Sequence, residues 1–256
     1  MNRINKIFKE KQNILSIYFT AGYPKLEDTS IILNELQKAG VDMIEVGIPF
    51  SDPLADGPII QHSGEVALKK GMSLKLLFEQ LSRLPIKNSN SAVLLMGYLN
   101  PILQFGVENF CRKASEAGIA GVILPDLPMQ EYLDEYKPVF DKYGLKNIFL
   151  ITPHTSVKRI RYIDEHTDGF IYMVASASTT GTKTGMDAEK EKYFARIKKM
   201  KLKNPVMVGF GISDRKSFAT ACAYANGAII GSAFIKSIEG SSDLKNDINN
   251  FIKKLK

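Results

Sequence analysis

Val41-Asp42-Met43-Ile44-Glu45-Val46-Gly47-Ile48 has the composition of a buried β-strand, yet it carries a glutamate in its middle. Side chains alternate between the two faces of a strand, so Glu45 shares one face with Met43 and Gly47. The other face is wholly aliphatic and suits contact with packed helices. We therefore expect Glu45 to point away from those helices, into an interior where a charged carboxylate is costly to bury.

Segments of the same strand-like kind recur along the chain and alternate with segments of helical periodicity. Strands that alternate with helices predict parallel pairing. Eight such units in 256 residues match the roughly 250 residues of a (β/α)8 barrel. The eight strands are expected at Ile14–Phe19, Met43–Ile48, Ala92–Met96, Gly121–Leu124, Asn147–Ile151, Phe170–Val174, Val206–Val208 and Ala228–Ile230.

The sequence thus predicts an α/β fold, a single-domain (β/α)8 TIM barrel over residues 1–256. The amphipathic segment Met1–Gln12 is expected to add an N-terminal helix. An open, doubly wound sheet is the alternative that the pattern leaves. Glycine follows the helix at four joints, and there we expect the left-handed cap conformation. These glycines are Gly40, Gly118, Gly144 and Gly227.

Composition restricts the classes of function. The net charge is +7, but the lysines cluster at the ends of helical segments without interleaved aromatics, which indicates a solvated face and not a nucleic-acid surface. No apolar run reaches the roughly 18 residues of a membrane span. Two distant cysteines and three histidines lack metal-ligand spacing, so we expect no metal site. We expect a cytoplasmic protein with reduced thiols.

A second carboxylate follows the strand of Glu45 on a loop. Asp56 lies in Ser51-Asp52-Pro53-Leu54-Ala55-Asp56-Gly57-Pro58. Two carboxylates in different environments can divide the acid and base roles of a reaction. Burial raises the pKa of a carboxyl and keeps a proton available near neutral pH, which suits Glu45 for acid–base work. Asp52 and Asp126 are weaker candidates, because aspartate is also an ordinary turn residue.

Glycine-rich turns follow the last two strands. Gly209-Phe210-Gly211-Ile212-Ser213 and Gly231-Ser232-Ala233 each lead into a helix, where backbone N–H groups favour an anion. Loops at this place form the recurrent phosphate site of barrels. The small polar segment Ala175–Lys183 is expected to be either an idle flexible loop or a lid that orders over the ligand and excludes water. The apolar segment Gly97–Phe105 is expected to be a loop that substrate or a partner covers.

At these residues the chain resembles the tryptophan synthase alpha chain family over essentially its whole length. The most specific block is Glu45-Val46-Gly47-Ile48-Pro49-Phe50-Ser51-Asp52-Pro53-Leu54-Ala55-Asp56-Gly57-Pro58. Shorter matches are Tyr18-Phe19-Thr20-Ala21-Gly22-Tyr23-Pro24, Leu124-Pro125-Asp126-Leu127-Pro128 and the two glycine turns. The resemblance implies a lyase that cleaves indole-3-glycerol phosphate to indole and D-glyceraldehyde 3-phosphate in tryptophan biosynthesis.

The resemblance also implies roles for individual residues. Glu45 matches the family's acid–base, and Asp56 matches the carboxylate that contacts the indole N–H. The pocket wall is then expected to include Phe19, Leu99, Tyr172 and Thr180. The phosphate cradle is expected at Gly181, Phe210, Gly211, Gly231 and Ser232.

The family implies no cofactor in this chain and a beta-chain partner, which carries pyridoxal phosphate, in an alpha2beta2 tetramer. Pro53, Pro128 and the apolar segment look like parts of that interface. One departure is Ser178-Thr179 where the family reads glycine and valine, which is expected to alter lid closure. The alternatives are a stand-alone lyase, a non-catalytic phosphate-binding subunit, and another sugar-phosphate aldolase or isomerase, which would need a Schiff-base lysine or metal ligands.

Overall fold

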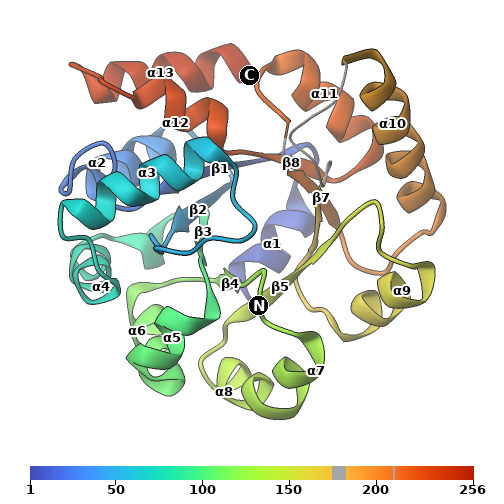
Figure 1. The fold of residues 1–256 in the computed structure, drawn as a ribbon, viewed down its shortest axis with the longest axis horizontal. Coiled ribbons are helices and arrows are strands. Elements are labelled where there is room, and N and C mark those ends of the chain that lie inside the picture. The colour runs from blue at the N-terminus through green and yellow to red at the C-terminus, as the bar shows by residue number, and fades with distance from the viewer. Residues whose placement is uncertain (175–182, 210) are drawn as a thin grey trace.

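The structure is a computed structural model that describes residues 1–174, 183–209 and 211–256. Of these residues, side chains are described for all except 183–188. Eight parallel strands pair in chain order, and β8 pairs with β1, so the sheet closes into a barrel (Figure 1). The strands are β1 (Ile14–Thr20), β2 (Met43–Gly47), β3 (Ala92–Met96), β4 (Gly121–Ile123), β5 (Lys146–Ile151), β6 (Ile171–Val174), β7 (Val206–Gly209) and β8 (Gly227–Ile230). Every predicted strand is confirmed to within one residue at each end.

Helices surround the barrel and bury their apolar faces against the strands (Figure 1). The first group is α1 (Arg3–Glu10), α2 (Asp28–Lys38), α3 (Pro58–Lys69), α4 (Leu74–Ser82), α5 (Leu99–Phe105), α6 (Val107–Ala117) and α7 (Met129–Glu131). The second is α8 (Lys137–Lys142), α9 (Val157–His166), α10 (Lys183–Lys199), α11 (Arg215–Tyr224), α12 (Ser232–Ile238) and α13 (Leu244–Leu255). A 3₁₀ turn, η1 (Ile86–Asn88), and a π-helical turn, η2 (Tyr132–Tyr136), complete the described elements.

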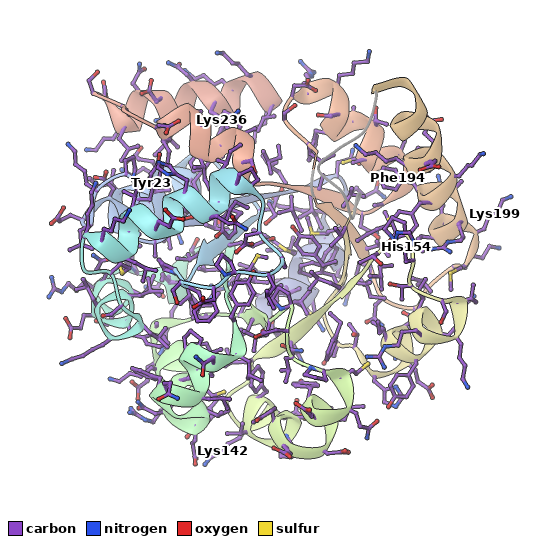
Figure 2. All side chains as sticks on the ribbon, viewed as in Figure 1. Tyr23, Lys142, His154, Phe194, Lys199 and Lys236 are labelled. Carbon is purple, nitrogen blue, oxygen red and sulfur yellow. The ribbon has the colours of Figure 1, made fainter. Side chains whose placement is uncertain are left out.

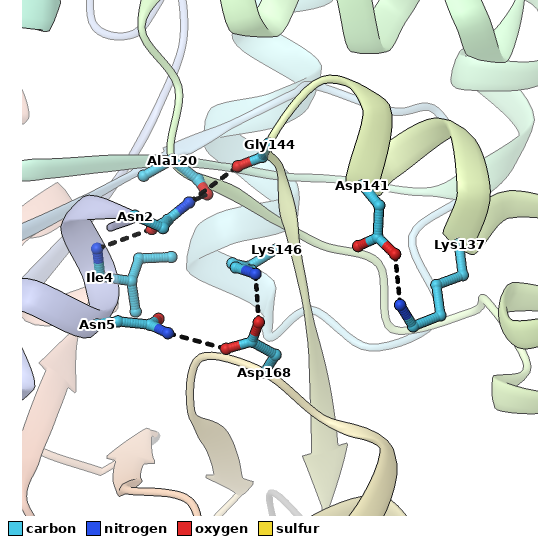
Figure 3. Close-up of polar contacts among 9 residues, drawn as sticks. All are labelled: Asn2, Ile4, Asn5, Ala120, Lys137, Asp141, Gly144, Lys146 and Asp168. Atoms are coloured by element: carbon cyan, nitrogen blue, oxygen red, sulfur yellow. Dashed lines mark hydrogen bonds and ion pairs between the residues drawn. The ribbon is translucent and has the colours of Figure 1, made fainter.

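The predicted N-terminal helix, α1, lies against the end of the barrel where the strands begin. Asn2 accepts a hydrogen bond from the Ile4 N–H, and its amide donates to the carbonyls of Ala120 and Gly144 at 2.8 and 2.9 Å (Figure 3). Ile4 is fully buried. The Asn5 amide donates to Asp168, which also pairs with Lys146. Because α1 closes this end, a ligand can enter only from the opposite end, where the strands finish.

Three of the four predicted glycine caps are confirmed. Gly40, Gly118 and Gly144 have φ angles of +70°, +84° and +69°. Gly227 is different, because it is the first residue of β8 and has no positive φ. A Cβ there would lie 2.2 Å from the Ile14 carbonyl oxygen, so glycine is required by the close approach of β1 and not by a helix cap.

Basic side chains lie on the outer helices, as the sequence predicted. Lys142 and Lys199 lie at the periphery of the molecule, far from the centre of the barrel (Figure 2). The interior is filled instead by side chains of the strands, most of which are fully buried (Figure 2). Among the residues that the structure describes, no helix has both the length and the apolar character needed to cross a membrane.

Candidate active site

Glu45 lies in the middle of β2 and its side chain has no exposed surface. The Ser16 hydroxyl of β1 donates a hydrogen bond to Glu45 Oε1 at 2.8 Å. The other carboxyl oxygen, Oε2, has no hydrogen-bond partner among the described residues. Burial raises the pKa of Glu45 to about 7, and the bond from Ser16 opposes this rise. The carboxyl therefore holds a proton that it can exchange near neutral pH.

Asp56 lies on the loop between β2 and α3 and is half-buried. The Tyr98 hydroxyl donates to Asp56 Oδ2 at 3.1 Å and accepts from the Ala55 N–H at 3.0 Å. Tyr98 is itself buried and packs on Phe50 with ring centroids 5.2 Å apart. Tyr98 thus fixes the loop and holds the carboxylate in place. Burial raises the pKa of Asp56, and the bond from Tyr98 lowers it.

A cavity opens at the end of the barrel where the strands finish. Tyr18 of β1 and Tyr172 of β6 line one part of it, and Gly211, Gly231 and Ser232 line another. Burial raises the pKa of both tyrosines, and the negative charges of Glu45 and Asp56 raise it further. Neither Glu45 nor Asp56 is among the residues that line this cavity, but both lie close enough to the two tyrosines to act on their pKa values. Ile60, Met96 and Ile229 supply apolar wall, together with Ile212, Ser213 and Ala233.

The rings of Tyr18 and Tyr172 occupy space that a side chain at Gly47 or Gly209 would fill. A Cβ on Gly47 would lie 2.1 Å from the Tyr18 hydroxyl oxygen, and one on Gly209 would lie 2.2 Å from that of Tyr172. Neither distance is compatible with non-bonded contact. Glycine at the mouth ends of β2 and β7 is thus required by the two aromatic rings, which turn over these strands.

We expect Gly47→Ala to displace the Tyr18 ring, because the new methyl group and the ring cannot both occupy that space. Overpacking of this kind costs about 1–3 kcal/mol of stability and disturbs the cavity wall. Urea unfolding and ligand affinity measure the two effects. Gly64→Ala is the matched control, because no atom outside its own stretch of α3 lies within 4 Å of its Cβ position. If Gly47→Ala and Gly64→Ala change stability and ligand affinity equally, the Tyr18 ring does not depend on the absence of a side chain at Gly47.

The structure brings four of the predicted binding residues together in the cavity and places two predicted wall residues outside it. Tyr172, Gly211, Gly231 and Ser232 line the cavity as predicted. Phe19 is fully buried and does not line it. The prediction is off by one position, because neighbours on a strand face opposite sides and Tyr18 is the residue that faces the cavity. Leu99 also does not line it, and Met96 of β3 does. Thr180, Gly181 and Phe210 lie outside the described residues, as do Ser178 and Thr179.

The apolar segment after β3 is not the loop that we expected. It forms α5, and Asp126 caps this helix by accepting the Leu99 N–H on both carboxyl oxygens at 3.0 Å. This contact explains Asp126 as a structural residue. Ile102 is buried within the molecule, while Leu103 is 45% exposed. The segment therefore covers much of its own apolar surface and leaves one large side chain in solvent.

The described residues contain no group of three His, Cys, Asp or Glu side chains that could hold a metal ion. The one lysine in the described strands, Lys146, begins β5 and pairs with Asp168 at the closed end of the barrel. It cannot reach the cavity at the opposite end. The arrangement thus favours acid–base chemistry by carboxylates over Schiff-base chemistry on a strand lysine.

Comparison with known proteins gives a consistent result. The family profile described as "Tryptophan synthase alpha chain" matches residues 4–256. The tryptophan synthase alpha chain of Flavobacterium psychrophilum is 57% identical over 238 residues, which cover 93% of this chain and 94% of the relative. The alpha chain of Christiangramia forsetii is 54% identical over 257 residues, which cover 100% of this chain and 99% of the relative.

Solved structures agree with the sequence relatives. The crystal structure of tryptophan synthase subunit alpha from Legionella pneumophila superposes with a TM-score of 0.88 at 36% identity, covering 100% of this chain and 97% of that one. A chain of tryptophan synthase from M. tuberculosis, in an aminoacrylate-bound form, superposes with a TM-score of 0.86 at 27% identity. The match covers 100% of this chain and 98% of that one. The family profile, the sequence relatives and the fold agree, and the chain belongs to the tryptophan synthase alpha chain family.

Proposed function

We propose that this chain cleaves indole-3-glycerol phosphate to indole and D-glyceraldehyde 3-phosphate, with Glu45 and Asp56 as the catalytic residues. Membership of the family makes the chain a lyase subunit of tryptophan biosynthesis. The observation that carries the assignment of residues is the pair of carboxylates in unlike environments. Glu45 is fully buried with a pKa raised to about 7, while Asp56 is half-buried on a loop. Such a pair separates the acid from the base.

Cleavage of the carbon–carbon bond needs the protein to carry out proton transfers only. Protonated Glu45 gives its proton to C3 of the indole ring, and the Asp56 carboxylate takes the proton from the ring N–H, which leaves a neutral indolenine. The bond from C3 to the side chain then breaks, and its electron pair restores the C2–C3 double bond of the ring. The hydroxyl on the departing carbon returns its proton to Glu45 and becomes the aldehyde. Asp56 returns its proton to the ring nitrogen, so both carboxyl groups end as they began.

The cavity has the two ends that this substrate needs. An indole ring suits the apolar and aromatic part, between Tyr18, Tyr172 and Ile60. The phosphate suits the part lined by Gly211, Gly231 and Ser232, because glycine turns that lead into a helix can present backbone N–H groups to an anion. We extend this cradle to Gly181 and Phe210, and the wall to Thr180, on the resemblance alone.

We expect Gly231→Asp to weaken binding of the substrate phosphate by at least about tenfold, because the new carboxylate repels the anion. A Cβ on Gly231 would lie 3.4 Å from Tyr18 Cδ1 and 3.7 Å from Ile60 Cδ1, so a side chain there enters the cavity. Calorimetric titration with glycerol phosphate measures the loss. Gly231→Ala is the control, since its methyl group makes only ordinary contacts. Equal affinity in both variants would remove this turn from the phosphate site.

The proposal includes a beta-chain partner that carries pyridoxal phosphate, in an alpha2beta2 tetramer, and no cofactor in this chain. Leu54 is 91% exposed on the loop that bears Asp56, and Leu103 is 45% exposed on α5. Both segments adjoin Tyr98, which binds Asp56. A partner that covers these side chains would thus act on the position of a catalytic carboxylate.

An assay of indole release with and without a beta chain tests this proposal and separates the alternatives. We expect slow cleavage by the isolated chain and a steep rise when the beta chain is added. High activity of the isolated chain would favour the stand-alone lyase. No cleavage under either condition, with phosphate binding intact, would favour the non-catalytic subunit.

A further inference from the structure

Ser16 makes the one hydrogen bond that Glu45 receives among the described residues. Its hydroxyl lies 2.8 Å from Glu45 Oε1, and both side chains have no exposed surface. The register pairs Ser16 with Met43 and Tyr18 with Glu45, so the bond runs diagonally between β1 and β2. A fully buried hydroxyl aimed at a fully buried carboxyl is a specific arrangement, because each group would otherwise be unsatisfied.

Within the part of the chain that the structure describes, Glu45 has no charged partner. On β3, Leu94 lies opposite Glu45 in the register and is apolar. The titratable groups that face it are Tyr18 on β1 and Tyr172 on β6. Burial raises the pKa of both above the ordinary value, so both are neutral near pH 7. No lysine, arginine or histidine of the described residues pairs with Glu45, and Asp56 acts on the same tyrosines from the loop side.

We propose that Ser16 is a positioning residue for Glu45, which holds Oε1 against the barrel wall and leaves Oε2 to exchange the proton with substrate. The inference rests on the proposed function for the identity of that substrate, but not for the contact itself. Oε2 is buried and has no hydrogen-bond partner among the residues that the structure describes. A carboxyl with one oxygen engaged and one vacant presents a single, defined site for the proton.

The same bond sets how readily the carboxyl gives up its proton. A hydroxyl that donates to a carboxylate stabilises the ionised form, so it opposes the effect of burial on the pKa of Glu45. Removing the hydroxyl leaves Oε1 buried and unsatisfied, which favours the protonated form. The pKa of Glu45 then rises. Because the free enzyme needs protonated Glu45, the falling limb of kcat/KM against pH moves to higher pH.

The test compares Ser16→Ala with Ser63→Ala by ¹³C NMR titration of the Glu45 carboxyl, whose signal Glu45→Gln identifies. Ser63 is equally buried but bonds Thr20, not Glu45, so it controls for loss of a buried hydroxyl. We expect the midpoint to rise by about one pH unit in Ser16→Ala and to stay in Ser63→Ala. We also expect a parallel shift of the kcat/KM limb. An unmoved midpoint in Ser16→Ala, or an equal shift in both variants, overturns the proposal.

A second pair of variants keeps the test decisive if Ser16→Ala fails to fold. Ser16→Thr and Ser16→Val have the same shape, suit a strand, and differ only by the hydroxyl. The threonine variant is expected to keep the wild-type midpoint and the valine variant to raise it. Equal midpoints contradict the role of Ser16. A shifted midpoint in a chain that releases no indole leaves the role of Ser16 intact and counts against the proposed function alone.

Discussion

Glu45→Gln is expected to reduce indole release by at least about 100-fold, because an amide cannot supply or take up the proton at C3. The glutamine has the same size and can still accept the bond from Ser16. Binding of glycerol phosphate is expected to stay unchanged, since the phosphate is assigned to the turn residues Gly211, Gly231 and Ser232 and not to Glu45. Glu35→Gln is the matched control, because Glu35 is a buried glutamate of α2 that pairs with Lys38 on the outside of the barrel. Activity of Glu45→Gln within a few-fold of wild type would refute the assignment.

The stability of the same variant gives an independent check, and its sign follows from linkage. Burial raises the pKa of Glu45 from 4.5 to about 7, so the folded chain holds the proton more tightly than the unfolded chain. Stability therefore falls progressively from about pH 4.5, where the carboxyl of the unfolded chain ionises, to about pH 7, and the full cost, on the order of 3 kcal/mol, applies above pH 7. Glu45→Gln removes this cost. We expect Glu45→Gln to unfold at a higher urea concentration than wild type at pH 8. At pH 5 we expect a smaller difference between the two unfolding midpoints.

Asp56→Asn is expected to have the second largest effect, a loss of indole release of at least about 100-fold. Asparagine can accept the Tyr98 hydroxyl as Asp56 does, so the loop keeps its anchor. It cannot take the proton from the ring nitrogen, and it cannot balance the positive charge that protonation at C3 places on the ring. The loss should therefore fall on kcat more than on KM.

Asp52→Asn is the control for this variant. Asp52 belongs to the same loop but is exposed, and it accepts a hydrogen bond only from its neighbour Ser51 among the described residues. We expect nearly wild-type activity. Similar losses in the two variants would mean that the loop responds to any change of charge, and that Asp56 has no specific part in the chemistry.

The sequence was sufficient for the barrel because the local patterns agreed with the fold. Counting faces on the strand of Glu45 placed its carboxyl in the interior, and the structure confirms a fully buried side chain. Gly227 shows where a local pattern fails. It follows a helix like the other three joint glycines, but the constraint on it comes from β1, more than 200 residues earlier.

The parts of the site that could not be predicted depend on contacts between distant residues. Tyr98 binds Asp56 across 42 positions, and Ser16 binds Glu45 across 29. Nothing in the spacing of these residues reveals that their polar atoms meet. The choice of Phe19 over Tyr18 fails for a related reason, because both are aromatic neighbours on one strand. Tyr18 is recognised as the wall residue because its ring occupies the space that a Cβ on Gly47 would need. The sequence alone does not show that these two residues meet.

We propose above all that this chain breaks the bond between indole C3 and the glycerol phosphate side chain. Its most direct test is the stoichiometry of products from indole-3-glycerol phosphate, measured with the beta chain present and no serine added. We expect one indole and one glyceraldehyde 3-phosphate for each substrate molecule that wild type consumes, and neither product from Glu45→Gln. Substrate that remains intact with wild type, or that loses phosphate without releasing indole, would contradict it.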